Sequence, residues 1–160
     1  MKRMRRKGQA LTEFAVMYSA VILPLTFMTI FVAEALWIWH GMVEFTRDGA
    51  RYAATHFCGQ ADGSNVLSYM QTHVPPVVDQ AQFQAGGTAS IQIQYTYAEG
   101  IDAAFCAGCI PDSVTVSVTD YTFGRLAGFL RLPGISMPPF TTNLPIESAG
   151  LDSTGASVCQ

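Results

Sequence analysis

The amino-acid sequence predicts an α+β protein in which a long N-terminal helix, apolar and then amphipathic, packs on a small antiparallel β-sheet. Three observations predict this class. Residues 14–33 form an apolar run without a charged side chain, and polar residues recur at helical spacing through residues 34–57. Residues 88–97 and 113–123 alternate β-branched or aromatic positions with small or polar ones, which is typical of half-buried strands.

The apolar run reads FAVMYSAVILPLTFMTIFVA. At about 1.5 Å per residue it spans about 30 Å, the thickness of a bilayer core. The alternative is a buried core helix, but a domain this small has no interior that surrounds one. We therefore expect residues 9–33 to cross a membrane, with Pro24 removing one backbone hydrogen bond and favouring a kink.

The charge distribution predicts the orientation of this span. Five of the nine basic residues lie within the first seven positions, whereas all twelve acidic residues follow Gly8. Basic residues stay on the cytoplasmic side, so we expect residues 1–8 in the cytoplasm and the C-terminal part outside the inner membrane. Trp37 and Trp39 follow the span, where indoles favour the lipid–water interface. The acidic remainder argues against nucleic acid as a partner.

Residues 34–57 are expected to continue the helix outside the membrane. Their polar stripe consists of His40, Glu44, Arg47, Asp48 and Arg51. The opposite side is largely apolar, with Met42, Val43, Phe45, Thr46, Ala50, Ala53, Ala54 and Phe57. Gly41 and Gly49 each weaken a helix interior by about 1 kcal/mol relative to alanine. We therefore expect this face to be supported by a packing surface, and the helix to stop near Gly59.

Residues 58–148 are expected to form a small α+β domain, followed by a tail at 149–160. Ser64 is a candidate cap for a helix through residue 72, and a second short helix is expected at residues 76–83. Residues 88–97, 113–123 and 140–147 are the expected strands.

Four cysteines follow the span, namely Cys58, Cys106, Cys109 and Cys159. In an oxidising compartment this even number predicts two disulfides, for which three connectivities exist. The proximity of Cys106 and Cys109 favours pairing these two and joining Cys58 to Cys159. The alternative connects Cys58 to the loop between the strands and closes a longer loop.

No catalytic constellation is evident. The sequence CAGC matches a redox motif, but Pro111 follows closely and no βαβ unit surrounds it. The three histidines lack nearby second ligands for zinc and are interpreted as surface or packing residues. Glu99 and Asp102 are interpreted as solvating charges, with a calcium site as the alternative. We therefore expect no enzyme activity, cofactor, metal or small-molecule substrate.

The junction between the basic cluster and the span carries the functional hypothesis. Glu13 lies five residues after Gly8, at the edge of the apolar run, where a carboxylate is costly unless it has a function or reaches the head groups. Cleavage after Gly8 would expose the α-amino group of Gln9, which Glu13 could pair with on its own or a neighbouring subunit. Two alternatives are an ordinary signal sequence cleaved before Leu36 and an uncleaved anchor.

The stretch GQALTEFAVMYSAVILPL resembles prepilin processing sites, and more specifically the start of TadE-like minor pseudopilins of the tight-adherence (Flp, type IVc) pilus. RDGARYAA, SVTVSVTDYTF and TTNLPIES resemble further parts of that family, so the resemblance covers about residues 8–54 and 113–148.

The resemblance implies a pilin-like fold. It also implies that Gly8 is the last leader residue, Gln9 the new N-terminus and Glu13 the fifth-position glutamate that acts in subunit assembly. The implied partners are membrane lipid, a prepilin peptidase, other pilin or pseudopilin subunits and the pilus assembly machinery. The implied role is a minor component of an adhesive pilus, the alternative being an unprocessed, signal-anchored extracytoplasmic binding protein.

Overall fold

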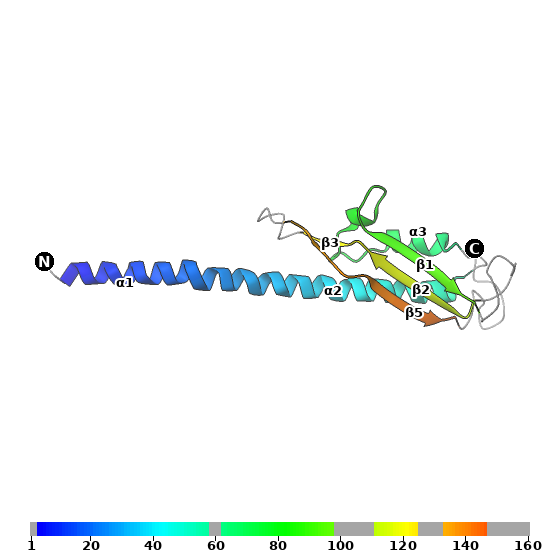
Figure 1. Cartoon of the computed structure of the whole chain (residues 1–160), viewed down its shortest axis with the longest axis horizontal. Coiled ribbons are helices and arrows are strands. Elements are labelled where there is room, and N and C mark those ends of the chain that lie inside the picture. The colour runs from blue at the N-terminus through cyan, green and yellow to red at the C-terminus, as the bar shows by residue number, and fades with distance from the viewer. Residues whose placement is uncertain (1–2, 58–61, 98–110, 125–132, 147–160) are drawn as a thin grey trace. The chain divides into compact units, whose positions relative to one another are not determined.

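The computed structural model describes residues 3–57, 62–97, 111–124 and 133–146, with side chains from Gly8 onward. The chain divides into two compact units, Met1–Trp37 and Ile38–Gln160. The first unit is helical and the second contains the sheet (Figure 1). The predicted α+β class, with a long N-terminal apolar helix and a small antiparallel sheet, is confirmed.

The first unit contains α1 (Arg3–Met17), the π-helical turn η1 (Tyr18–Ile22) and the beginning of α2 (Leu23–Thr55). The Leu23 amide donates to the Tyr18 carbonyl, one residue beyond the usual α-helical partner. Pro24 follows directly, and its ring would crowd the carbonyl four residues earlier in a regular α-helix. The irregularity expected at Pro24 is thus a widened turn that precedes it.

The helical segment Gly8–Thr55 is long and apolar enough to cross a membrane. Its 18-residue apolar window has a mean hydropathy of 2.1, and none of that window is buried within the chain. Helices with these properties can anchor a protein in a membrane, and signal sequences near an N-terminus share them.

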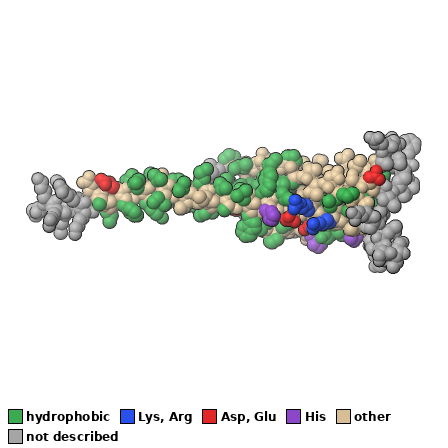
Figure 2. Space-filling model, turned by 90° about the horizontal axis from the view of Figure 1, so that it is seen from below, with side chains coloured by type: hydrophobic (Ala, Val, Ile, Leu, Met, Phe, Trp, Pro, Cys, Tyr) green, Lys and Arg blue, Asp and Glu red, His purple; other side chains and the backbone are tan. Residues whose placement is uncertain are grey.

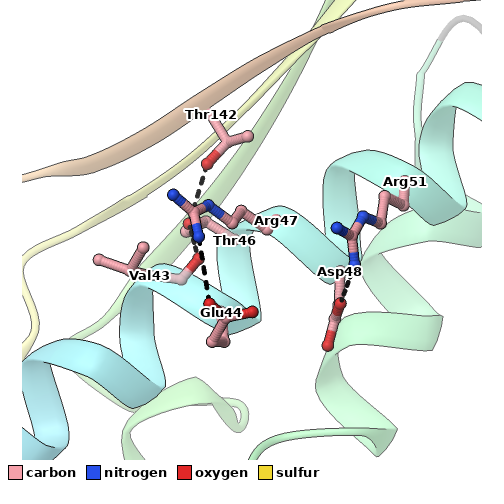
Figure 3. Close-up of polar contacts among 7 residues, drawn as sticks. All are labelled: Val43, Glu44, Thr46, Arg47, Asp48, Arg51 and Thr142. Atoms are coloured by element: carbon pink, nitrogen blue, oxygen red, sulfur yellow. Dashed lines mark hydrogen bonds and ion pairs between the residues drawn. The ribbon is translucent and has the colours of Figure 1, made fainter.

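From Ile38 onward, α2 packs its apolar face into the second unit. The buried residues of this face are Ile38, Met42, Phe45, Thr46, Gly49, Ala50, Ala53 and Ala54. The polar stripe lies on the exposed side, where Arg47 pairs with Glu44 at 3.1 Å and Arg51 with Asp48 at 3.5 Å (Figure 3). The helix ends at Thr55, two residues earlier than predicted, and the Asn65 amide donates to the His56 carbonyl at 2.6 Å.

Three strands form the main sheet in the order β1 (Ser90–Thr96), β2 (Ser113–Thr119) and β5 (Phe140–Pro145), with both pairs antiparallel. Central β2 turns three fully buried valines inward, namely Val114, Val116 and Val118. Two contacts join this face to α2. Trp39 meets Phe140 edge to face at 4.8 Å, and Thr142 Oγ1 donates to Thr46 Oγ1 at 3.1 Å.

The single strand predicted at residues 113–123 is wrong. It breaks at Asp120, whose φ of 59° lies in the left-handed region, and Thr122–Phe123 form a separate strand, β3. β3 pairs with β4 (Ile135–Ser136), which the sequence pattern did not predict because two residues are too few for periodicity. The strand predicted at 140–147 ends at Pro145, and that at 88–97 shortens to 90–96.

The helix α3 (Ser64–Thr72) lies where predicted, but Ser64 is its first residue and Gly63, at φ 66°, is its N-cap. The predicted second helix is reduced to a 3₁₀ turn, η2 (Gln80–Phe83), because the extended Asp79 interrupts it and caps Ala81 N. The Gln82 side chain accepts from Thr122 N at 2.9 Å and donates to Thr122 O at 2.8 Å. These two bonds attach η2 to β3.

Candidate functional site

The predicted processing and assembly residues lie on exposed helical surface in α1. Gln9 Nε2 donates to Glu13 Oε1 at 3.4 Å, across one helical turn. Thr12 Oγ1 donates to the Gln9 carbonyl at 2.8 Å. The structure therefore places Gln9 and Glu13 on one face of the helix, within reach of each other.

The surroundings of Gly8 give no packing reason for a glycine. Among the side chains that the structure describes, a Cβ atom at Gly8 would have no neighbour within 4 Å. At Gly41 and Gly49, by contrast, a Cβ would lie 2.6 Å from Val77 Cγ2 and 2.5 Å from Met70 Sδ. Close packing therefore accounts for Gly41 and Gly49, and confirms that this part of α2 rests on a packing surface. The glycine before Gln9 has no such explanation in the fold.

The first unit presents large apolar side chains on all sides of its helix. Leu11, Phe14 and Met28 are each about two-thirds exposed or more. Figure 2 shows hydrophobic side chains along this helical segment, whereas the blue side chains gather over the second unit. Apolar exposure of this extent is stable in lipid or against other apolar helices.

All four cysteines, and with them both disulfide hypotheses and the CAGC motif, lie outside the described residues. Glu99 and Asp102 lie outside them too. Those predictions remain predictions.

Within the described part of the chain, no group of three or more His, Cys, Asp or Glu side chains could hold a metal. An open depression of ≈ 610 Å³ is lined by Leu67, Gln71, Phe83 and neighbours that include no titratable group. A smaller one of ≈ 200 Å³ lies between α2 and α3, beside Asp48, Tyr69 and His73. The larger depression contains no general base, and in the smaller one the His73 ring is stacked on the Tyr69 ring with the centroids 4.2 Å apart.

Four stacked aromatic rings lie between α2 and α3, and the sequence did not predict this stack. Its order is His56, Tyr52, Tyr69 and His73, with successive ring centroids 4.2, 3.9 and 4.2 Å apart. The sequence signal is the pattern Y-x-x-T-H, which occurs at residues 52–56 and again at 69–73. The rings hold the two helices together, as the packing interpretation of these two histidines predicted.

Tyr95 is the one described group with a clearly shifted pKa. Its ring is buried against Phe57 at 4.9 Å, and its hydroxyl has no hydrogen-bond partner within the described structure. Burial, with smaller contributions from Tyr97 and Asp62, raises the pKa of Tyr95 to about 12. Tyr95 lies in the core, away from any candidate site.

Comparison with protein-family models, with curated proteins and with solved structures finds no match for this chain.

Proposed function

We propose that this chain is a minor pseudopilin of a tight-adherence type pilus, anchored in the inner membrane and cleaved after Gly8 by a prepilin peptidase. Its role is structural, in assembling an adhesive fibre with other pilin subunits. The observation that carries the proposal is the arrangement of Gly8, Gln9 and Glu13 between a basic leader and an exposed apolar helix.

Gly8 supports the proposal because the fold does not require it. A glycine in a helix interior costs about 1 kcal/mol relative to alanine, and no described neighbour approaches Gly8 closely enough to require a glycine there. A peptidase that needs a small residue before the cleaved bond supplies the missing reason.

Glu13 supports the proposal because it lies one turn from Gln9. The Gln9 side chain already reaches the carboxylate. After cleavage the Gln9 α-amino group would begin the helix, and a carboxylate one turn away on its own or an adjacent subunit would pair with it. In a low-dielectric bundle such a pair fixes the register between subunits.

Replacement of the carboxylate tests this role. We expect Glu13→Ala to insert into the membrane normally and to be missing from sheared pili, measured by immunoblotting of membrane and pilus fractions. Glu34→Ala is the matched control, because it removes the carboxylate that directly follows the far end of the apolar run.

The control should appear in pili at the wild-type level. Wild-type incorporation of Glu13→Ala would contradict the assembly role of the carboxylate. Equal loss of both variants would attribute the defect to the helix in general, and would contradict it as well.

A further inference from the structure

The three-stranded sheet carries no charge. None of the twenty residues of β1, β2 and β5 is Lys, Arg, Asp, Glu or His. An average domain with about 25% charged residues would place about five there. The described charges of the second unit lie instead on α2 and in the connections, as Asp62, Asp79, Asp112 and Asp120 illustrate.

The register defines a polar but uncharged outer face. Residues paired with Ser113, Thr115, Ser117 and Thr119 turn away from the buried valines. This face consists of Ser90, Gln92, Gln94, Thr96, Ser113, Thr115, Ser117, Thr119, Thr141, Asn143 and Pro145. It measures about 14 by 24 Å, or about 340 Å², from ordinary strand spacings. That is less than half the area of about 800 Å² that each partner contributes to a stable interface, so the face alone makes a poor docking surface.

Both edges of the sheet lack the features that ordinarily block strand pairing. β1 and β5 contain no lysine, no inward-pointing charge and no bulge, and the one proline, Pro145, ends its strand. No strand among the described residues pairs with the outer side of either one. Among the described residues, each edge strand therefore has backbone donors and acceptors that no further strand pairs.

The two edges are complementary to each other in direction. β1 and β5 are both antiparallel to β2, so they run parallel to each other. Copies of the chain that follow one another in the same orientation therefore place β5 of one copy beside β1 of the next. Like edges can meet only after a half-turn of one copy. A half-turn about the normal to the sheet reverses α2, and a half-turn about the strand direction moves α2 to the opposite face of the sheet, so neither gives copies in the same orientation.

Electrostatics also favours contact at these edges. The described part of the second unit carries six carboxylates and two arginines, so two copies bring the same net negative charge to any contact. The sheet edges are the places where backbones can approach without bringing like charges together.

We propose that copies of this chain associate by sheet extension, the β5 edge of one copy pairing in parallel with the β1 edge of the next. The contact is heterologous, so it repeats and yields an open row or a ring of copies. It relies on membrane anchoring for a common orientation, but not on cleavage after Gly8 or on Glu13.

Lysines on the edges test the proposal in the full-length, uncleaved chain. Three variants each add two lysines to the outer face: Gln92→Lys with Gln94→Lys on β1, Thr141→Lys with Asn143→Lys on β5, and Thr115→Lys with Ser117→Lys on central β2. The β2 variant is the matched control, because it adds the same charge to the same face. It also breaks the Asn143–Thr115 hydrogen bond, which the β5 variant breaks as well.

Association is measured in liposomes by energy transfer between donor- and acceptor-labelled copies carrying dyes on a C-terminal tag. We expect each edge variant to associate about tenfold more weakly than the wild type or more, and the β2 control to match the wild type. Circular dichroism and thermal melting verify that all three variants are folded.

Mixing the two edge variants gives the decisive result. A β1-blocked copy still has a free β5 edge, and a β5-blocked copy still has a free β1 edge. Each variant alone should show the same weakened association, about tenfold or more below the wild type, whereas the mixture should form pairs that grow no further. Wild-type association of the edge variants, absence of pairs in the mixture, weakened association of the β2 control, or a monomeric wild type would each overturn the proposal. None of these outcomes depends on the N-terminal residue of the mature protein, so they are separable from failure of the proposed function.

Discussion

Gly49 shows how one residue sets the approach of two helices. A Cβ at this position would lie 2.5 Å from Met70 Sδ. Either the Met70 side chain or the whole of α3 would therefore have to move. Met70 is itself fully buried, which leaves it little room to yield.

We expect Gly49→Ala to destabilise the second unit by about 1–3 kcal/mol, because overpacking outweighs the gain in helix propensity. Urea unfolding followed by circular dichroism measures the change. Met70→Ala in the same chain should relieve the clash, so the double variant should be more stable than the sum of the two single effects predicts. Simple additivity would contradict the close approach.

Tyr95 links the core to alkaline pH. Because its pKa is raised to about 12 in the folded chain, the folded state keeps the phenol proton between about pH 10 and pH 12 while the unfolded chain loses it. The stabilisation is complete below pH 10 and is lost as the pH rises toward 12, at about 1.4 kcal/mol per pH unit.

Tyr95→Phe should remove this loss and should cost little at pH 7, because the hydroxyl it deletes is buried without a hydrogen bond in the described structure. The measurement is the free energy of unfolding at pH 8 and pH 11 for both proteins. An equal decrease with pH in both would show that Tyr95 does not cause it.

At the scale of elements, Asp120 decides where the central strand ends. Its φ of 59° turns the chain between β2 and β3, and Asp and Asn tolerate this conformation better than other residues with side chains. The turn allows Tyr121 to bury its ring while its hydroxyl accepts from the Asp79 amide at 3.1 Å.

We expect Asp120→Gly and Asp120→Asn to be nearly neutral and Asp120→Val to destabilise the fold by about 1–2 kcal/mol, because a β-branched side chain is strained at positive φ. Thermal melting of the three variants compares them. Equal stability of the valine and glycine variants would contradict a left-handed turn at this residue.

Some elements of the fold could be predicted from the sequence and others could not. Alternation located β1, β2 and β5, and helical spacing located the buried face of α2, because each pattern extends over several residues. The β2–β3 break, the two-residue strand β4 and the η2 turn depend on single residues and on tertiary hydrogen bonds such as Gln82 to Thr122. Local periodicity carries no information about such contacts.

The residues of the candidate site could likewise be predicted only in part from the sequence. Gly8, Gln9 and Glu13 could be selected from sequence because a carboxylate within an apolar run is expensive. The stacked rings could not, since Tyr52 and Tyr69 are seventeen positions apart and meet only when α3 folds back on α2.

At the scale of the whole molecule, the chain combines an exposed apolar helix with an acidic domain whose sheet carries no charge. The first feature favours lipid or other helices as its surroundings, and the second favours sheet extension between copies. Both suit a protein that works as one subunit among many, which is the function we propose.

The N-terminal residue of the protein isolated from its native membrane tests this account most directly. Mass spectrometry should find a mature chain that begins at Gln9. Gly8→Leu should remain uncleaved while its second unit folds normally, because Gly8 belongs to the first unit and no described side chain crowds it. A wild-type chain that retains Met1, or one that begins at Leu36, would contradict processing by a prepilin peptidase and with it the proposed role in a pilus.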